Sequence, residues 1–280
     1  MTEDIIQELR AGQTTAYIDG RAASNLAYKP QFVSNNHSQG KKVLSSVEDE
    51  ILKCDKFQIS VAFITMGGIT PLLQTLKKLE QKGIPGEILT TNYLNFSEPR
   101  ALNKLHKLSN VTLRMYDVEA ADEGFHTKGY IFKKEEVYRI IIGSSNMTSA
   151  ALTSNREWNT KIVSTEQGEM AQEIVSEFSE LWDSQFTRSF DEFYENYKER
   201  YNIIKRQREI AKQDEIPSME KNRLQPNSMQ VGFISNLRKI IEAGEERALL
   251  ISATGEHVII MTSKKALQIG HSSLSFLLHQ

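Results

Sequence analysis

A regular alternation of helical and strand patterns between residues 40 and 117 is the feature that most constrains the fold of this chain. Strand patterns lie at 57–65, 86–94 and 111–117, and helical patterns lie at 43–52, 69–83 and 98–108. Ser97 is the expected N-cap of the last of these helices, because its hydroxyl can accept a bond from a free backbone N–H. Such alternation is typical of parallel strands joined by helices. It predicts an α/β fold with a mixed, largely parallel sheet flanked by helices.

The rest of the chain predicts further elements around this unit. A short helix is expected at Thr2–Arg10, and two strands joined by a charged turn are expected between His126 and Gly143. A strand at 157–164 and an amphipathic helix at 166–186 follow, and then a charged connector helix at 188–213 without a clear apolar stripe. The expected division is 1–39 (N-terminal helix and irregular lead), 40–187 (main α/β domain), 188–223 (charged helix and linker) and 224–280 (a small C-terminal appendage).

Charge and cysteine content narrow the function classes. The chain carries 34 Lys and Arg against 36 Asp and Glu, so a globally basic nucleic-acid binder is excluded but a local basic stripe is not. The most basic stretch, Lys198–Lys212, is expected to be a solvated face of the connector helix rather than a nucleic-acid contact.

Cys54 is the single cysteine and is expected to be structural rather than a nucleophile. No signal peptide or apolar membrane segment is recognisable, so the expected location is cytoplasmic, with no membrane partner.

The residues that could carry chemistry gather in one stretch, 125–159. Three consecutive predicted strands begin or end there with polar side chains: His126, Lys128, Ser144, Ser145, Asn146 and Glu157. His126 and Lys128 are two residues apart, and a period of two puts both side chains on one face of a strand. We therefore expect this set near one edge of the sheet.

These residue types suit phosphate chemistry. An imidazole can attack an electrophile or carry a proton at neutral pH. A lysine, a serine and an asparagine can hold a phosphate and stabilise the charge that develops on it. A carboxylate on the far ring nitrogen fixes the tautomer of a histidine. A metal site is the weaker interpretation, because no second His or Cys stands at ligand spacing, so no metal or cofactor is expected.

His126-Thr127-Lys128 and Gly143-Ser144-Ser145-Asn146 resemble the paired His-x-Lys and Gly-Ser-x-Asn motifs of the phospholipase D superfamily. Many members carry an Asp where this chain has Lys133. The nuclease branch lacks that Asp and has a Glu further along, a place that Glu157 fits. The resemblance covers roughly residues 40–186 and favours the nuclease branch.

The resemblance implies a metal-independent cleavage of DNA. His126 attacks the phosphodiester and forms a covalent phosphohistidine, while Lys128, Asn146 and the two serines bind phosphate oxygens and Glu157 orients the imidazole. A second histidine protonates the leaving oxygen. Because the chain shows one such motif, that histidine is expected from a second copy, in a homodimer that shares one active site.

The C-terminal region resembles the start of a superfamily 2 helicase motor. Gln225 and Gln230 are similar to its adenine-reading motif, and the run at 248–255 is similar to the strand that leads into its phosphate-binding loop. The loop itself is incomplete, because Gly255-Glu256 is followed by His257-Val258 instead of the Gly-Lys pair that cradles phosphates. We expect no ATP hydrolysis by this chain. The combination implies the nuclease part of a bacterial helicase-nuclease in restriction or phage defence, with a helicase motor or another defence subunit as a further partner.

Two other function classes remain open at this point. One is a lipid phosphodiesterase, which the missing Asp and the helicase-like C-terminal region disfavour. The other is a non-catalytic module that binds phosphate and dimerises to target a helicase to DNA.

Overall fold

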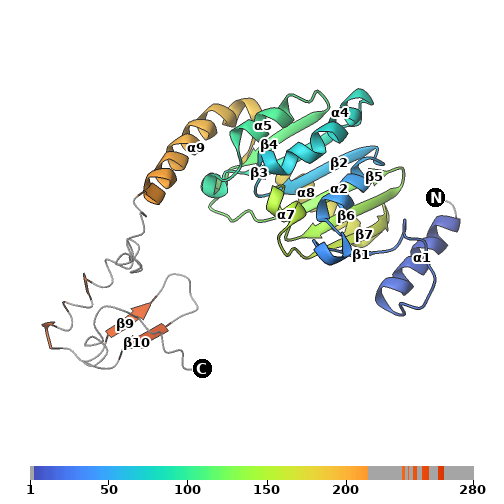
Figure 1. Ribbon diagram of the computed structural model, residues 1–280, viewed down its shortest axis with the longest axis horizontal. Helices are drawn as coiled ribbons and strands as arrows, with labels where there is room; N and C mark the ends of the chain where they lie inside the picture. Colours follow the sequence, from blue (N-terminus) through green and yellow to red (C-terminus); the bar gives the residue numbers. More distant parts are fainter. Residues whose placement is uncertain are drawn as a thin grey trace. The chain divides into compact units, whose positions relative to one another are not determined.

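Helices and strands alternate along the chain to form an eight-stranded mixed sheet that is covered by helices on both faces (Figure 1). The computed structural model describes residues 3–213, 235–236, 239, 242–244, 248–251 and 258–261. By contacts within the chain, residues Met1–Glu209 form one unit and Ile210–Gln280 form a second. The expected mixed α/β architecture with flanking helices is confirmed.

The helices are α1 (Glu3–Tyr17), η1 (His37–Gln39), α2 (Val43–Ile51), α3 (Met66–Ile69), η2 (Thr70–Leu72), α4 (Leu73–Gln81), η3 (Tyr93–Asn95), α5 (Pro99–His106), α6 (Val118–Ala121), α7 (Ser149–Thr153), α8 (Glu169–Trp182) and α9 (Phe190–Gln213), where η marks a 3-10 helix. The strands are β1 (Gln31–Val33), β2 (Lys56–Val61), β3 (Gly86–Thr91), β4 (Val111–Tyr116), β5 (Lys128–Lys134), β6 (Val137–Gly143), β7 (Asn159–Thr165), β8 (Thr187–Ser189), β9 (Ala248–Ile251) and β10 (Val258–Met261).

The eight strands of the main sheet lie in the order β1-β7-β6-β5-β2-β3-β4-β8. Only β2–β3 and β3–β4 pair in parallel, and the other five pairings are antiparallel. The expectation of a largely parallel sheet is therefore wrong. Helical crossovers connect β2, β3 and β4, whereas β5, β6 and β7 follow one another as antiparallel neighbours, which short connections allow.

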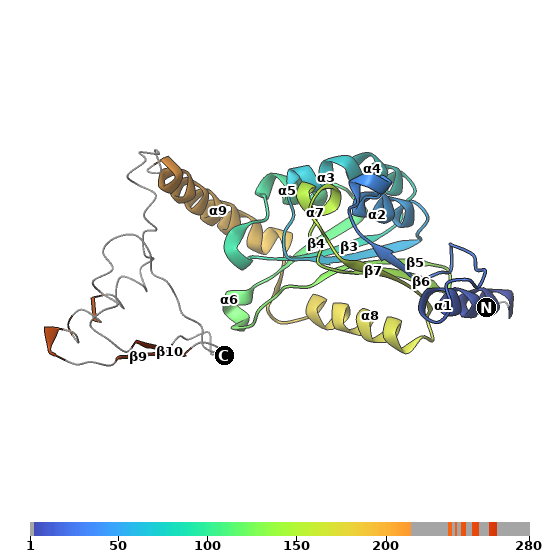
Figure 2. The same cartoon turned by 60° about the horizontal axis from the view of Figure 1, so that its bottom comes forward.

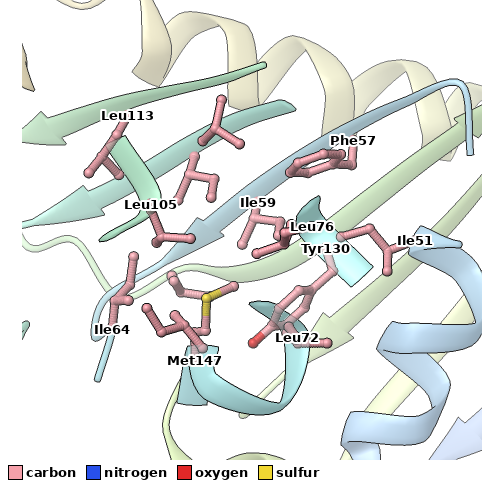
Figure 3. Packing of buried hydrophobic residues seen from close by; sticks show 14 of the residues in the cluster. Ile51, Phe57, Ile59, Ile64, Leu72, Leu76, Leu105, Leu113, Tyr130 and Met147 are labelled. Carbon is pink, nitrogen blue, oxygen red and sulfur yellow. The ribbon is translucent and has the colours of Figure 1, made fainter. Parts of the chain in front are cut away.

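Two apolar cores cover the two faces of this sheet. Helices α2, α3, α4, α5 and α7 lie on one face and α8 lies on the other (Figure 2). Phe57 and Ile59 of β2 and Tyr130 of β5 project into the first core, against the helices (Figure 3). The alternate residues Ile131 and Ile140 belong to the second core, with Phe178 of α8. Polar and apolar residues alternate along the central strand β2, but because both faces of the sheet are covered, its polar residues Gln58 and Ser60 are buried as well.

The connector helix α9 has a buried stripe that the sequence analysis missed. Phe190, Phe193 and Tyr197 recur at helical spacing and belong to the first core. The hydroxyl of Tyr197 donates to the backbone oxygen of Ser97 at 2.8 Å. The aromatic residues were overlooked because charged residues surround them in the sequence. This part of α9 is therefore docked on the main unit and is not a freely solvated connector.

Ser97 does not cap α5 as expected, because the N-cap is Glu98, whose side chain makes no capping bond. The hydroxyl of Ser97 is fully buried and accepts a bond from the backbone N–H of Ile64 at 3.1 Å. It therefore joins the loop after β2 to the start of α5, which a local capping rule cannot foresee.

Several expectations for the C-terminal region lie outside the described residues: the linker at 214–223, Gln225, Gln230 and the loop residues from Gly255 to His257. Within the second unit, β9 covers part of the expected 248–255 strand and pairs with β10 in antiparallel fashion. No helix of the described residues is long and apolar enough to cross a membrane.

Candidate active site

The polar residues of the 125–159 stretch meet at one edge of the sheet. β5 begins at Lys128, which lies opposite Val61 at the end of β2. β6 ends at Gly143, which lies opposite Asn159 at the start of β7. The antiparallel course of these strands therefore places the start of β5, the end of β6 and the start of β7 beside one another.

His126 and Lys128 are in direct contact at this edge. The ammonium group of Lys128 lies 2.6 Å from His126 Nδ1 and donates to the backbone oxygen of His126 at 2.7 Å. In a neutral imidazole this contact makes Nδ1 the acceptor and leaves the ring proton on Nε2. His126 lies just before β5, and the spacing of two residues, read from the sequence, thus brings together the two residues expected to form the centre of the site.

The pKa values of His126 and Lys128 are both lowered, which favours the neutral form of each group. Partial desolvation and then the charge of Lys128 lower the pKa of His126 below its ordinary value of 6.5. Burial lowers the pKa of Lys128, and the charge of Glu157 partly opposes that shift. Because its pKa is lowered, the neutral form of the His126 imidazole predominates at neutral pH, and the lone pair of its unprotonated nitrogen, Nδ1, accepts from Lys128.

Replacement of Lys128 by Gln should raise the pKa of His126 toward its ordinary value, because the charge of Lys128 is removed while the partial desolvation of the ring stays. A pH titration of the His126 ring signals by NMR measures this pKa directly. Lys133→Gln is the control, since Lys133 lies at the other end of β5 and pairs with Glu166. A His126 pKa that falls or stays constant in Lys128→Gln would contradict the assignment.

Glu157 and Ser144 form a second pair beside Lys128. The hydroxyl of Ser144 donates to the Glu157 carboxylate and accepts a bond from the backbone N–H of Trp158 at 3.1 Å. The Glu157 side chain is buried, and its charge acts on Lys128. The expected contact between Glu157 and the imidazole of His126 is not made, because Lys128 occupies Nδ1 of that ring. The carboxylate therefore balances the charge of Lys128 and holds Ser144.

Asn146 and Ser145 differ in their availability to a substrate. The side-chain oxygen of Asn146 accepts the backbone N–H of Phe63 at 3.0 Å, which fixes the side chain and leaves its NH₂ group to donate elsewhere. Ser145 is 0% exposed, and its hydroxyl accepts a bond from Asn159 at 2.9 Å. The buried hydroxyl of Ser145 holds the strand end in place, and the structure does not present it to a substrate, in contrast to the role expected from the sequence.

Two residues that support the site were missed in the sequence. The amide of Asn159 joins Ser145 to the backbone of Val33, and the hydroxyl of Tyr130 donates to the backbone oxygen of Ser145 at 3.1 Å. Asn159 stands two residues after Glu157, so the period of a strand could have placed it on the same face. The role of Tyr130 depends on the pairing of β5 with β6, which local sequence patterns do not predict.

Gly143 is required by the close approach of two strands at this edge. A Cβ atom on Gly143 would lie 2.2 Å from the backbone oxygen of Trp158. Any other residue would therefore push the end of β6 away from β7 and separate Ser144 from Glu157.

Cys54 is not part of the site. It is buried, its thiol donates to the backbone oxygen of Ile51 at 3.1 Å, and burial raises its pKa to about 12. A thiol in this state is a poor nucleophile, which confirms the structural role expected of it.

Comparisons with known proteins find one family model that matches part of this chain. Residues 49–182 match the family described as cardiolipin synthase, PLD-like domain. No curated protein matches the chain significantly.

Three solved structures illustrate what the chain resembles. NucT from Helicobacter pylori has a TM-score of 0.45 and 18% identity, over 56% of this chain and 96% of its own. The phospholipase D family member Nuc from Salmonella typhimurium has a TM-score of 0.43 and 17% identity, over 57% and 98%. Phosphatidylserine synthase from Haemophilus influenzae has a TM-score of 0.44 and 14% identity, over 65% and 46%. The family match covers residues 49–182, a little less than half of the chain, and over that stretch the chain is similar to PLD-like domains.

Proposed function

We propose that this chain is a metal-independent phosphodiesterase that cleaves DNA through a covalent intermediate on His126. The observation that carries the proposal is the contact of a neutral, accessible imidazole with a buried lysine, beside a carboxylate–hydroxyl pair and an oriented asparagine. This set supplies a nucleophile and donors for the phosphate at one sheet edge.

The first step uses His126 as nucleophile. A bound phosphodiester competes with Nδ1 for the ammonium of Lys128, and the ring proton then resides on Nδ1. The lone pair of Nε2 forms a bond to phosphorus while the bond to the leaving oxygen breaks and that oxygen takes a proton. Lys128, the NH₂ group of Asn146 and the exposed hydroxyl of Ser144 bind the remaining phosphate oxygens. Water then attacks phosphorus and gives a proton to the group that protonated the leaving oxygen, the N–P bond breaks, and the free imidazole is restored.

We propose that the proton for the leaving oxygen comes from a second copy of the chain. Within the part of the chain that the structure describes, no other histidine contacts His126. A homodimer with its two-fold axis at the site would supply the partner copy's own imidazole. Sedimentation at assay concentrations should therefore give twice the mass of the chain, and a monomer that still cleaves would contradict the dimer.

The biological setting that we propose is the nuclease part of a bacterial helicase-nuclease in restriction or phage defence. It rests on the helicase-like sequence at 224–255 alone. A helicase motor or another defence subunit would be the further partner.

A lipid phosphodiester is the alternative substrate, since the matching family is described as cardiolipin synthase. The same histidine chemistry would act on it. A non-catalytic DNA-binding module is the other alternative, because phosphate-binding residues alone would serve such a module.

Incubation of the protein in excess EDTA with plasmid DNA, single-stranded DNA or RNA, and separately with cardiolipin vesicles, distinguishes these functions. We expect DNA cleavage that EDTA does not inhibit and no lipid turnover at the same enzyme concentration. Faster turnover of the vesicles would favour the lipid enzyme, and DNA binding without cleavage would favour the module.

A further inference from the structure

Three aromatic side chains gather beside the candidate active site. The rings of Phe63 and Tyr93 stack with centroids 6.4 Å apart and an interplanar angle of 14°. The ring of Phe96 meets Phe63 edge-on with centroids 5.2 Å apart. We call Phe63, Tyr93 and Phe96 the aromatic platform.

The aromatic platform is connected directly to the phosphate-binding residues. The backbone N–H of Phe63 donates to the side-chain oxygen of Asn146 at 3.0 Å, and the backbone oxygen of Phe63 accepts a bond from Met147 at 3.1 Å. A phosphate held by the NH₂ group of Asn146 would therefore have the platform next to it.

Tyr93 and Phe96 are too exposed to solvent to be part of an apolar core. Tyr93 is 38% exposed and Phe96 is 42% exposed. The loop between them contains two consecutive residues with positive φ, Leu94 at 52° and Asn95 at 48°. A left-handed conformation is uncommon for residues other than glycine, and such strain is concentrated at functional sites. The loop thus presents aromatic rings to solvent at a conformational cost.

Arg208 of α9 adds a positive charge to the aromatic platform. Its guanidinium lies 4.3 Å from the centre of the Phe96 ring and donates to the backbone oxygen of Leu94 at 2.9 Å. No carboxylate of the described residues forms an ion pair with Arg208, whereas its neighbours Arg200 and Lys205 on α9 are both paired. The platform therefore combines exposed rings with an uncompensated cation, which together match a nucleobase and its backbone phosphate.

We propose that the aromatic platform stacks an unpaired nucleobase of the nucleotide that flanks the scissile phosphodiester, while Arg208 binds a backbone phosphate of the same strand. This inference rests on the proposed nuclease function. The faces of bases inside a double helix are covered by their neighbours, so a base can reach the platform only from a single strand or an opened duplex. The site therefore prefers single-stranded nucleic acid.

The test measures binding with the His126→Ala variant, so that cleavage does not interfere. The probes are a fluorescent oligo-dT and an abasic oligomer of equal length, which carry the same phosphates but differ in their bases. We expect the oligo-dT to bind more tightly by about tenfold, the effect of one stacked base. Adding Tyr93→Ala should abolish that difference, whereas adding Tyr93→Phe should retain it because the ring remains.

The matched control is Tyr17→Ala, an exposed tyrosine at the end of α1, which should leave the preference unchanged. Equal binding of the two probes by the parent, or loss of the preference in Tyr17→Ala, would overturn the proposal. Dissociation of a dimer by Tyr93→Ala in the absence of nucleic acid would also overturn it, because the platform would then be a contact between chains.

Arg208→Gln should weaken the binding of both probes and reduce the slope of log affinity against log salt by about one. An unchanged slope would contradict the binding of a backbone phosphate by Arg208. The proposed nuclease function is tested separately, by DNA cleavage with the wild-type protein. The base preference is measured in a variant that does not cleave, so the two proposals can fail independently.

Discussion

Replacement of His126 by Ala should abolish phosphodiester cleavage while leaving the fold intact. His126 is exposed at the start of β5, so its removal creates no cavity in the core. Loss of a catalytic nucleophile typically lowers kcat by about four to six orders of magnitude, and the proposed covalent step cannot occur without the imidazole. The measurement is cleavage of labelled DNA in EDTA by the variant and by the wild-type protein.

The matched control is His37→Ala, because His37 is another exposed histidine. It should cleave at the rate of the wild-type protein. Quenching the wild-type reaction under alkaline denaturing conditions should leave a labelled nucleotide on the peptide that contains His126. Cleavage by His126→Ala at more than about a hundredth of the wild-type rate would rule out His126 as the nucleophile.

Replacement of Glu50 by Ala should cause the largest loss of stability among the charged residues of the main unit. Glu50 of α2 is 6% exposed and pairs with Lys161 of β7 at 3.0 Å and with Arg139 of β6 at 3.5 Å. Removing the one acid leaves the buried ammonium of Lys161 without its partner. Breaking a buried pair in this way costs about 3–5 kcal/mol.

The control for this effect is Glu119→Ala. Glu119 pairs with Arg200 in a contact whose side chains are 53% and 49% exposed. An exposed pair contributes about 0–1 kcal/mol, so this variant should unfold near the wild-type urea midpoint. Urea unfolding of the two variants, followed by circular dichroism, makes the comparison. Similar urea midpoints for Glu50→Ala and Glu119→Ala would contradict the burial of the ion pairs that Glu50 forms with Lys161 and Arg139.

Local patterns in the sequence were sufficient to predict much of the fold. The helices and strands expected between residues 40 and 117 are all present, with boundaries that shift by a few residues. These elements follow from apolar periodicity, which needs only a few neighbouring residues to be recognised. The expectation of a largely parallel sheet was wrong because the relative direction of strands depends on pairing across the whole domain, and β5 pairs with β2 in antiparallel fashion.

The candidate site was predicted in part. His126 and Lys128 meet as their spacing implies, and Ser144 lies against Glu157. The partner of Glu157 and the burial of Ser145 were not foreseen. The partner of Glu157 and the burial of Ser145 both depend on which side chains are removed from water together. That is decided only when strands distant in the sequence come together.

The sequence by itself thus determined the helices and strands between residues 40 and 117 and the pair of residues two apart that contact one another at the start of β5, but it ended the first helix at Arg10, whereas α1 runs to Tyr17, and it missed β1 and β8. Only the tertiary structure decided the neighbours of that pair. Asn146 meets Phe63, and Arg208 of α9 meets the loop after β3, across 83 and 114 residues of chain. The physical reason is that periodicity is a property of neighbouring residues, whereas the groups around a site are selected by burial and hydrogen bonding between segments far apart in the sequence.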